Sequence, residues 1–196
     1  LSIRSGDAQR AVDDYLTRAL VQFKRSRDRF GQAEAINALG IGYERLGQSA
    51  DAVEQFSKAV ELRRGLGNRF GEATSLRNLG NVLAIAGKHV EAEQALQQAR
   101  SLHAALGNRS GLATVENDLG LLAEERGNFP AALQAFKRAL LAWRQLDDRM
   151  GIAQAQNDIG FAHYQLGAYN DADVYLRQAA DGYASLGDAT GRIRVA

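Results

Sequence analysis

The sequence predicts an all-α protein in which antiparallel helix hairpins stack into a solenoid. A gapless period of 40 residues recurs four times and keeps small or apolar residues in fixed columns. One such column is Gly40, Gly80, Gly120 and Gly160. Within one copy Ala52, Phe56 and Ala59 share a helix face, and no stretch alternates with the period of two of a strand. Each hairpin therefore covers its apolar face only by packing on the next one.

Residues 6–27 come first and are expected to form a lone leading helix. Ala11, Tyr15 and Ala19 have the spacing of one helix face and repeat the small and aromatic positions of later second helices. Matching both ends of this segment to the repeat requires a slip of one residue, which leaves its register open.

Four complete hairpins and the start of a fifth follow. The expected boundaries are 29–67, 68–107, 108–147 and 148–187, with a truncated repeat over 188–196. In the second hairpin we expect helices over about 69–86 and 89–106, closed by turn glycines and capped by Asn68, as Asp148 caps the fourth hairpin. Pro130 fits the first turn of a second helix, where its missing N–H costs nothing. The start at Leu1 and the stop within a repeat indicate a piece of a longer protein.

Gly40 and its three counterparts fall in the middle of first helices, where each glycine costs about 1 kcal/mol relative to alanine. Because this cost recurs in every copy, we expect a packing reason rather than a ligand. The prediction is that Gly40 lets the first helix approach the second closely, against the small face of Ala52 and Ala59.

The copies share a set of spaced residues, which in the first copy are Leu39-Gly40, Tyr43, Gly47, Ala52, Phe56 and Ala59. This spacing resembles the tetratricopeptide repeat signature over nearly the whole chain. The copies are longer than the common repeat of about 34 residues, and they lack its usual final proline. With Asn-Leu-Gly-Asn at 78–81, they are similar to the repeats of Pins-type adaptors, kinesin light chain and bacterial peptide-sensing regulators. The resemblance implies a right-handed superhelix whose first helices line a concave, peptide-binding groove.

The resemblance also implies which side chains line that groove. The expected ligand-binding residues are Asn37, Arg77, Asn78, Asn81, Asn117, Asp118, Asn157, Asp158 and Phe161. An asparagine offers one acceptor and two donors, so a ladder of them can hold a peptide main chain. Arg77 can bind a ligand carboxylate through two bonds, while nearby acids favour a ligand that is basic toward one end. The alternative is that these groups face water or tie neighbouring helices together.

Aromatic residues accumulate in the last complete hairpin, which contains Phe161, Tyr164, Tyr169, Tyr175 and Tyr183. We expect them to cover the hydrophobic end of the array or to pack against a further repeat. The alternative is a contact patch, through which copies of the chain would pair end to end as a homo-oligomer.

Composition argues against several partner classes. The 24 Lys and Arg nearly balance 23 Asp and Glu, so no overall field selects nucleic acid or an anionic membrane. Basic residues near 24–27 and 63–69 are offset by acids elsewhere, and nucleic acid is therefore not the expected partner. Apolar runs are far shorter than the ~20 residues of a membrane span. The absence of cysteine fits a reducing compartment, and the cytoplasm is the default expectation.

Neither a catalytic nor a metal-binding constellation is expected. His89, His103 and His163 fall in different columns and have no ligand partner at helical spacing. The glycines flank turns or lie 40 residues apart, so they do not form a phosphate-binding loop. We therefore predict a protein without enzyme activity, metal or cofactor.

The sequence favours a protein–protein interaction module that binds a peptide or partner segment in its concave groove, as part of a larger signalling or regulatory protein. One alternative is a structural spacer or self-association module without a groove ligand. A nucleic-acid-binding helical repeat is the third interpretation. The identity of the ligand does not follow from the sequence.

Overall fold

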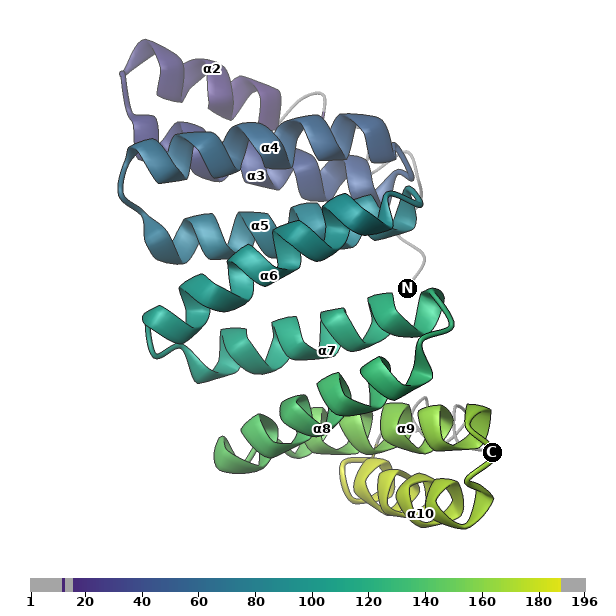
Figure 1. The fold of residues 1–196 in the computed structure, drawn as a ribbon. Coiled ribbons are helices and arrows are strands. Elements are labelled where there is room, and N and C mark those ends of the chain that lie inside the picture. The colour runs from purple at the N-terminus through teal and green to yellow at the C-terminus, as the bar shows by residue number, and fades with distance from the viewer. Residues whose placement is uncertain (1–11, 13–15, 188–196) are drawn as a thin grey trace. The chain divides into compact units, whose positions relative to one another are not determined.

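The computed structural model describes residue 12 and residues 16–187, and all regular secondary structure within them is helical (Figure 1). In chain order the helices are α2 Thr17–Arg25, α3 Arg29–Arg45, α4 Ser49–Gly65, α5 Arg69–Ile85, α6 His89–Ala105, α7 Arg109–Glu125, α8 Phe129–Gln145, α9 Arg149–Gln165 and α10 Tyr169–Ser185. The all-α hairpin fold predicted from the repeat is therefore confirmed.

The helix boundaries agree closely with the sequence pattern. The helices expected over 69–86 and 89–106 are observed at Arg69–Ile85 and His89–Ala105. The expected leading helix over 6–27 includes α2, which ends at Arg25, so that residues 26 and 27 form a turn instead of helix; residues 6–11 and 13–15 lie outside the described residues. The expected truncated repeat over 188–196 lies outside them as well.

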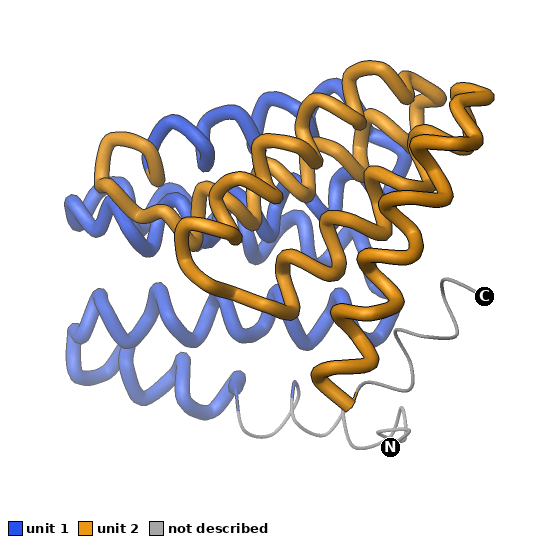
Figure 2. Tube along the Cα trace, turned by 90° about the horizontal axis from the view of Figure 1, so that it is seen from below, with its two compact units in different colours: residues 1–102 blue, residues 103–196 orange. Residues whose placement is uncertain are grey.

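The chain divides into two compact units, residues 1–102 and 103–196 (Figure 2). The division falls inside α6, between Leu102 and His103. In unit 1, α4 packs against both α3 and α5; in unit 2, α8 packs against both α7 and α9. A second helix thus contacts the first helix of its own copy and the first helix of the next copy.

Side-chain caps define where the first helices begin. The Asp28 carboxylate and the Asn68 amide oxygen accept hydrogen bonds from the N–H groups of Gly31 and Gly71, both at 2.9 Å. Asp148 caps α9 in the same way, so the predicted N-caps Asn68 and Asp148 are confirmed. These bonds satisfy a first-turn donor that has no partner within its own helix.

The core consists of the small and large apolar columns of the repeat. In unit 1, Ala52, Phe56 and Val82 form a fully buried cluster. In unit 2 the main cluster is Ala132, Phe136, Leu140, Ala155, Ile159 and Ala162. Both clusters join a second helix to a first helix, which is the packing that a stack of hairpins requires.

The mid-helix glycines allow a close approach of the second helix, with a large side chain of that helix nearest to each of them. A Cβ on Gly40 would lie 2.6 Å from the Phe56 ring, and one on Gly80 would lie 2.6 Å from Leu96. Close packing at these glycines is confirmed. The sequence pointed to Ala52 and Ala59 as the facing surface, whereas the three atoms nearest to a Cβ on Gly40 all belong to the Phe56 ring.

Candidate functional site

A surface hollow of about 470 Å³ lies between the two first helices of unit 1. It is lined by Ile41, Glu44 and Arg45 from α3 and by Arg77, Asn78, Asn81 and Ile85 from α5. The structure therefore brings three of the predicted ligand-binding residues, Arg77, Asn78 and Asn81, to one concave site. Arg77 and Asn78 are adjacent on α5 and Asn81 lies one turn further along, so all three are on one side of the helix.

The hollow contains both signs of charge beside apolar surface. Burial raises the pKa of the Glu44 carboxyl above its ordinary value, and the neighbouring Arg45 and Arg77 partly oppose this shift. Arg77 also donates a 3.3 Å hydrogen bond from Nη2 to the side-chain oxygen of Asn78. Ile85 is 66% exposed at the end of the hollow. Such a surface can contact a ligand through charge, amide hydrogen bonds and apolar packing at once.

Asn37 is the predicted site residue that lies beneath this surface rather than on it. It is buried, and its side-chain oxygen accepts a hydrogen bond from Ser75 Oγ at 3.0 Å and a longer one from Asn78 Nδ2 at 3.5 Å. Asn37 therefore joins α3 to α5. This is the helix-tying role that the sequence left open as the alternative to ligand binding.

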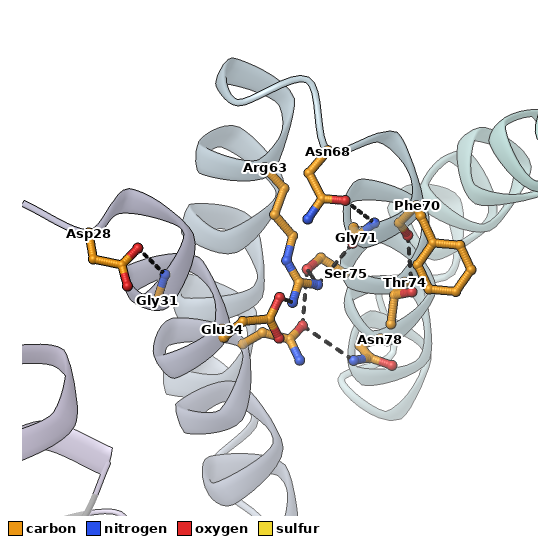
Figure 3. Close-up of polar contacts among 11 residues, drawn as sticks. Asp28, Gly31, Glu34, Arg63, Asn68, Phe70, Gly71, Thr74, Ser75 and Asn78 are labelled. Atoms are coloured by element: carbon orange, nitrogen blue, oxygen red, sulfur yellow. Dashed lines mark hydrogen bonds and ion pairs between the residues drawn. The ribbon is translucent and has the colours of Figure 1, made fainter. Parts of the chain in front are cut away.

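A buried arginine completes this network and was not anticipated from the sequence (Figure 3). Arg63 near the end of α4 donates from Nη1 to Ser75 Oγ at 2.8 Å and to the Gly71 carbonyl at 2.9 Å. Its Nη2 donates to the Glu34 carboxylate at 2.6 Å. One guanidinium thus links the N-terminal halves of α3 and α5.

The repeat pattern did contain a signal for Arg63. Its column is occupied by a large side chain in every copy: Phe23, Arg63, His103, Trp143 and Tyr183. The first four of these side chains each lie close to a glycine in the first turn of the next first helix, and each would be among the atoms nearest to a Cβ placed on that glycine. A column that keeps its size while its chemistry varies is typical of an inter-hairpin packing position.

The remaining predicted site residues lie on the first helices of unit 2. Asn117 is buried, whereas Asn157 and Asp158 are half-buried and joined by a 3.4 Å hydrogen bond from Asn157 Nδ2 to Asp158 Oδ1. Asp118 is half-buried, and Phe161 is 41% exposed. Their binding role remains a prediction.

Unit 2 also carries an acidic and aromatic surface. Burial raises the pKa of Glu124, and the adjacent Glu125 raises it further. At the turn between α9 and α10 the exposed rings of Tyr164 and Tyr169 meet edge to face, 5.6 Å apart. The last hairpin therefore presents aromatic surface to solvent, which is compatible with both sequence-based interpretations of these rings.

Metal clusters and membrane spans are not found in the described ranges, residue 12 and residues 16–187. No three His, Asp or Glu side chains in that part of the chain gather as a metal site would require. None of the described helices combines the length and the apolar character needed to cross a bilayer.

Comparison with solved structures shows the same fold at low sequence identity. BtubC (BKLC) from P. vanneervenii is 22% identical with a TM-score of 0.85, over 93% of this chain and 75% of that one. The nearly identical TPR-like repeats of a kinesin light chain candidate from Podosopora anserina are 17% identical with a TM-score of 0.77, over 94% and 90%. A Rap protein complexed with competence and sporulation factor is 16% identical with a TM-score of 0.84, over 97% and 53%.

Sequence comparison gives the family directly. No curated protein sequence matches the chain significantly. The tetratricopeptide repeat model, however, matches residues 31–105, 71–140 and 111–185. These overlapping matches span most of the sequence and coincide with the helix hairpins, so the chain belongs to the tetratricopeptide repeat family.

Proposed function

We propose that this chain is a protein-interaction module that holds a segment of a partner protein against its first helices, with the hollow between α3 and α5 as the main contact. The observation that carries the proposal is the concave site where Arg77, Asn78 and Asn81 meet Ile41 and Ile85. It offers hydrogen-bonding groups and exposed apolar surface side by side, as recognition sites for extended segments do.

Each part of the hollow has a distinct role in this proposal. The amides of Asn78 and Asn81 bind main-chain groups of the segment, since an amide can donate and accept at once. Ile41 and Ile85 pack against an apolar side chain, and Arg77 and Glu44 select charge at particular positions of the ligand. None of these roles involves a chemical step, and the proposal includes neither an enzyme activity nor a cofactor.

The family and the similar structures support an interaction role. Tetratricopeptide arrays bury a continuous core between hairpins and leave an extended inner surface, which repeat proteins use for binding. The Rap protein that shares this fold was solved as a complex with competence and sporulation factor. At 16% identity this likeness extends to the fold alone, so the ligand of the present chain has to be found by experiment.

Self-association is a second candidate function, favoured by the aromatic surface of the last hairpin. Tyr164 is 55% exposed and Tyr169 is 64% exposed, which is unusual for two adjoining rings without a partner surface. Analytical ultracentrifugation of the wild type and of Tyr164→Ser with Tyr169→Ser tests this directly. A concentration-dependent dimer that the double variant loses would support it.

Affinity capture tests the groove proposal. The chain is immobilised, extract from its source cells is passed over it, and retained proteins are identified by mass spectrometry. The hollow variant combines Arg77→Ala and Asn81→Ala and leaves the buried Asn37 intact. The matched control combines Glu54→Ala and Lys58→Ala, which removes an exposed ion pair from α4. Both variants are first compared with the wild type by circular dichroism and thermal unfolding.

The outcome is read from the difference between the two variants. A partner retained by the wild type and the control but lost by the hollow variant supports a binding groove between α3 and α5. If the wild type, the control and the hollow variant all retain the partner, the contact lies on another surface and the groove proposal is wrong. Binding is then quantified by calorimetry with segments of the retained partner.

A further inference from the structure

Unit 1 carries an exposed cluster of cations where two of its first helices begin. The basic edge consists of Lys24, Arg25, Arg27, Arg29 and Arg69, all of them exposed. These residues lie at the α2–α3 turn and at the α4–α5 turn, which Figure 1 shows at the same side of unit 1. The Arg63 guanidinium bridges Glu34 and Gly71, so the two helix starts lie within the reach of one side chain.

These cations are not used by the fold. Within the described part of the chain, none of the five side chains takes part in a hydrogen bond or ion pair. The nearby Arg63 and Arg64 differ, because they pair with Glu34 and Glu72 at 2.6 and 2.7 Å. The acid inside the basic edge, Asp28, is itself occupied as the N-cap of α3. The basic edge therefore has positive charge available for another molecule.

Helix electrostatics argue against a stabilising role for two of them. Arg29 and Arg69 are the first residues of α3 and α5. A cation at the N-terminus of a helix opposes the macrodipole and does not stabilise the helix. An arginine nevertheless begins the first helix in all four copies, the other two being Arg109 and Arg149. In unit 1 these arginines belong to a cluster with the exposed Lys24, Arg25 and Arg27, and a cluster of this kind can bind an external anion.

Exposed aromatic rings connect the basic edge to the hollow. Phe30 is 57% exposed and Phe70 is 59% exposed, directly after the two arginines. Ile41 follows Phe30 by eleven residues, and Asn81 follows Phe70 by the same interval, which is about three helical turns. The two rings therefore share the helix faces that line the hollow, and a segment running along this face would meet both.

The charge is also concentrated in this half of the sequence. Residues 1–102 contain 15 Lys and Arg against 12 Asp and Glu, whereas residues 103–196 contain 9 against 11. The near-neutral net charge of the whole chain conceals this difference between its two halves. An acidic ligand would thus be attracted to the unit that contains the hollow.

We propose that the segment bound in the hollow continues across the basic edge, where it presents carboxylates and a large apolar side chain to Arg29, Arg69, Phe30 and Phe70. This inference rests on the proposed function and adds the chemistry and direction of its ligand. Guanidinium groups match carboxylates in a two-pronged geometry, and the rings accept the apolar side chain. The distance along α3 from Phe30 to Glu44 is about 21 Å, which an extended segment covers with about six or seven residues.

A peptide fits this surface better than a nucleic acid. The same face of α3 contains Glu34 and, at the hollow, Glu44. A phosphate backbone carries negative charge at every step and would meet both carboxylates. A peptide can instead place acids at the basic edge and a neutral or basic residue near Glu44. The ligand is therefore expected to be acidic at one end only.

Selection from a random library of twelve-residue peptides displayed on phage tests this inference and does not require an identified partner. The baits are the wild-type chain, the edge variant Arg29→Glu with Arg69→Glu, and the matched control Arg109→Glu with Arg149→Glu from the same column of unit 2. Wild type and control should select peptides enriched in Asp and Glu beside a large apolar residue. The edge variant should lose that enrichment and bind the selected acidic peptides at least about tenfold more weakly, while a peptide with Lys in place of the acids regains affinity for it.

The outcomes separate this inference from the proposed function. Selected peptides that depend on Arg77 and Asn81 but show no acidic enrichment would overturn the inference and leave the groove in place. If no selected peptide depends on Arg77, Asn81 or the basic edge, both the inference and the proposed function are wrong. A third outcome is that no acidic peptides are selected, but the wild type and the control bind single-stranded poly(U) and the edge variant does not. That result would overturn the inference in favour of a nucleic-acid ligand. All variants are checked for wild-type thermal unfolding first.

Discussion

Glu116 on α7 accepts a 2.8 Å hydrogen bond from Arg138 Nε on α8, and one repeat later Gln156 donates to Gln178 at the same distance. The Glu116 side chain is 6% exposed and that of Arg138 is 48% exposed. The same pair of positions is therefore occupied by an ion pair in one hairpin and by two neutral amides in the next. In both cases the bond joins the two helices of one hairpin.

This relationship predicts which substitutions the pair tolerates. Arg138→Ala removes the ion pair from a buried carboxylate and should lower the free energy of unfolding by about 1 to 2 kcal/mol. Replacing both residues by Gln copies the next hairpin and should stay within about 0.5 kcal/mol of wild type. Urea unfolding provides the values, with the exposed Arg177→Ala as a control that should change little. Equal losses in the single and double variants would contradict this account.

The mid-helix glycines predict opposite effects of the same substitution at two sites. Gly40→Ala places a methyl group against the Phe56 ring and should destabilise the chain by about 1 to 3 kcal/mol through overpacking. Gly65→Ala, at the end of α4, meets no atom within 4 Å and should stabilise the helix by up to about 1 kcal/mol. Thermal unfolding of the two variants tests the contrast. A gain in stability at Gly40 would show that the ring yields freely.

A turn aspartate offers a stabilising substitution. Asp147 has a φ of 53°, in the left-handed region, at the turn position that Gly67 and Gly107 occupy in other copies. The left-handed conformation costs an L-residue roughly 1 to 2 kcal/mol, less for Asp, and glycine adopts it freely. Asp147→Gly should therefore raise the free energy of unfolding by about 0.5 to 1 kcal/mol. Asp147→Ala, which retains a Cβ, is the control and should not stabilise in the same urea unfolding measurement.

Arg63 should be far more important for stability than its neighbour. Arg63→Ala removes a guanidinium whose side chain is 4% exposed, together with its bonds to Glu34, Ser75 and the Gly71 carbonyl. We expect a loss of about 2 to 4 kcal/mol, because buried polar partners remain behind. Arg64→Ala affects an arginine that is 56% exposed but leaves the Glu72 carboxylate, whose side chain is 11% exposed, without this partner, and should cost about 1 kcal/mol. Chemical denaturation of the two variants in parallel measures both losses, and equal losses would contradict this expectation.

The hollow should give stability a measurable pH dependence through Glu44. Burial raises the pKa of this carboxyl, so the folded chain holds the proton more tightly than the unfolded chain. Its contribution to stability is full below the unfolded pKa and is lost as the pH rises through the folded pKa. Glu44→Gln should therefore match wild type below about pH 4 and become the more stable of the two toward pH 7. An advantage of Glu44→Gln that instead grew toward low pH would contradict this account. Glu54→Gln, at a side chain of α4 that is 58% exposed, serves as the control.

Part of the candidate site was predictable because it depends on position along a helix. The resemblance to the tetratricopeptide repeat implied that Arg77, Asn78 and Asn81 face the groove, and their spacing of one and three or four residues keeps them on one side of α5. Glu44 lies on the same side of α3 as Ile41, and Ile85 lies one turn after Asn81 on α5, so helical spacing also places these two lining residues in the hollow. The basic edge was harder to predict, because the overall balance of acidic and basic residues hides an excess of basic residues in the first half of the chain.

The sequence by itself determined the repeat, the helix boundaries and the caps of this protein. These features depend on residues a few positions apart, such as Asn68 and Gly71, whose spacing already implies the bond between them. Only the tertiary structure decided which polar side chains form hydrogen bonds and ion pairs within the protein. Glu34 and Arg63 lie 29 residues apart, and Asn37 and Ser75 lie 38 apart, so their pairing depends on how neighbouring helices dock. Docking buried Asn37 and Arg63 and left Arg29 and Arg69 exposed, because a side chain is desolvated by the helix packed against it and not by its place in the sequence.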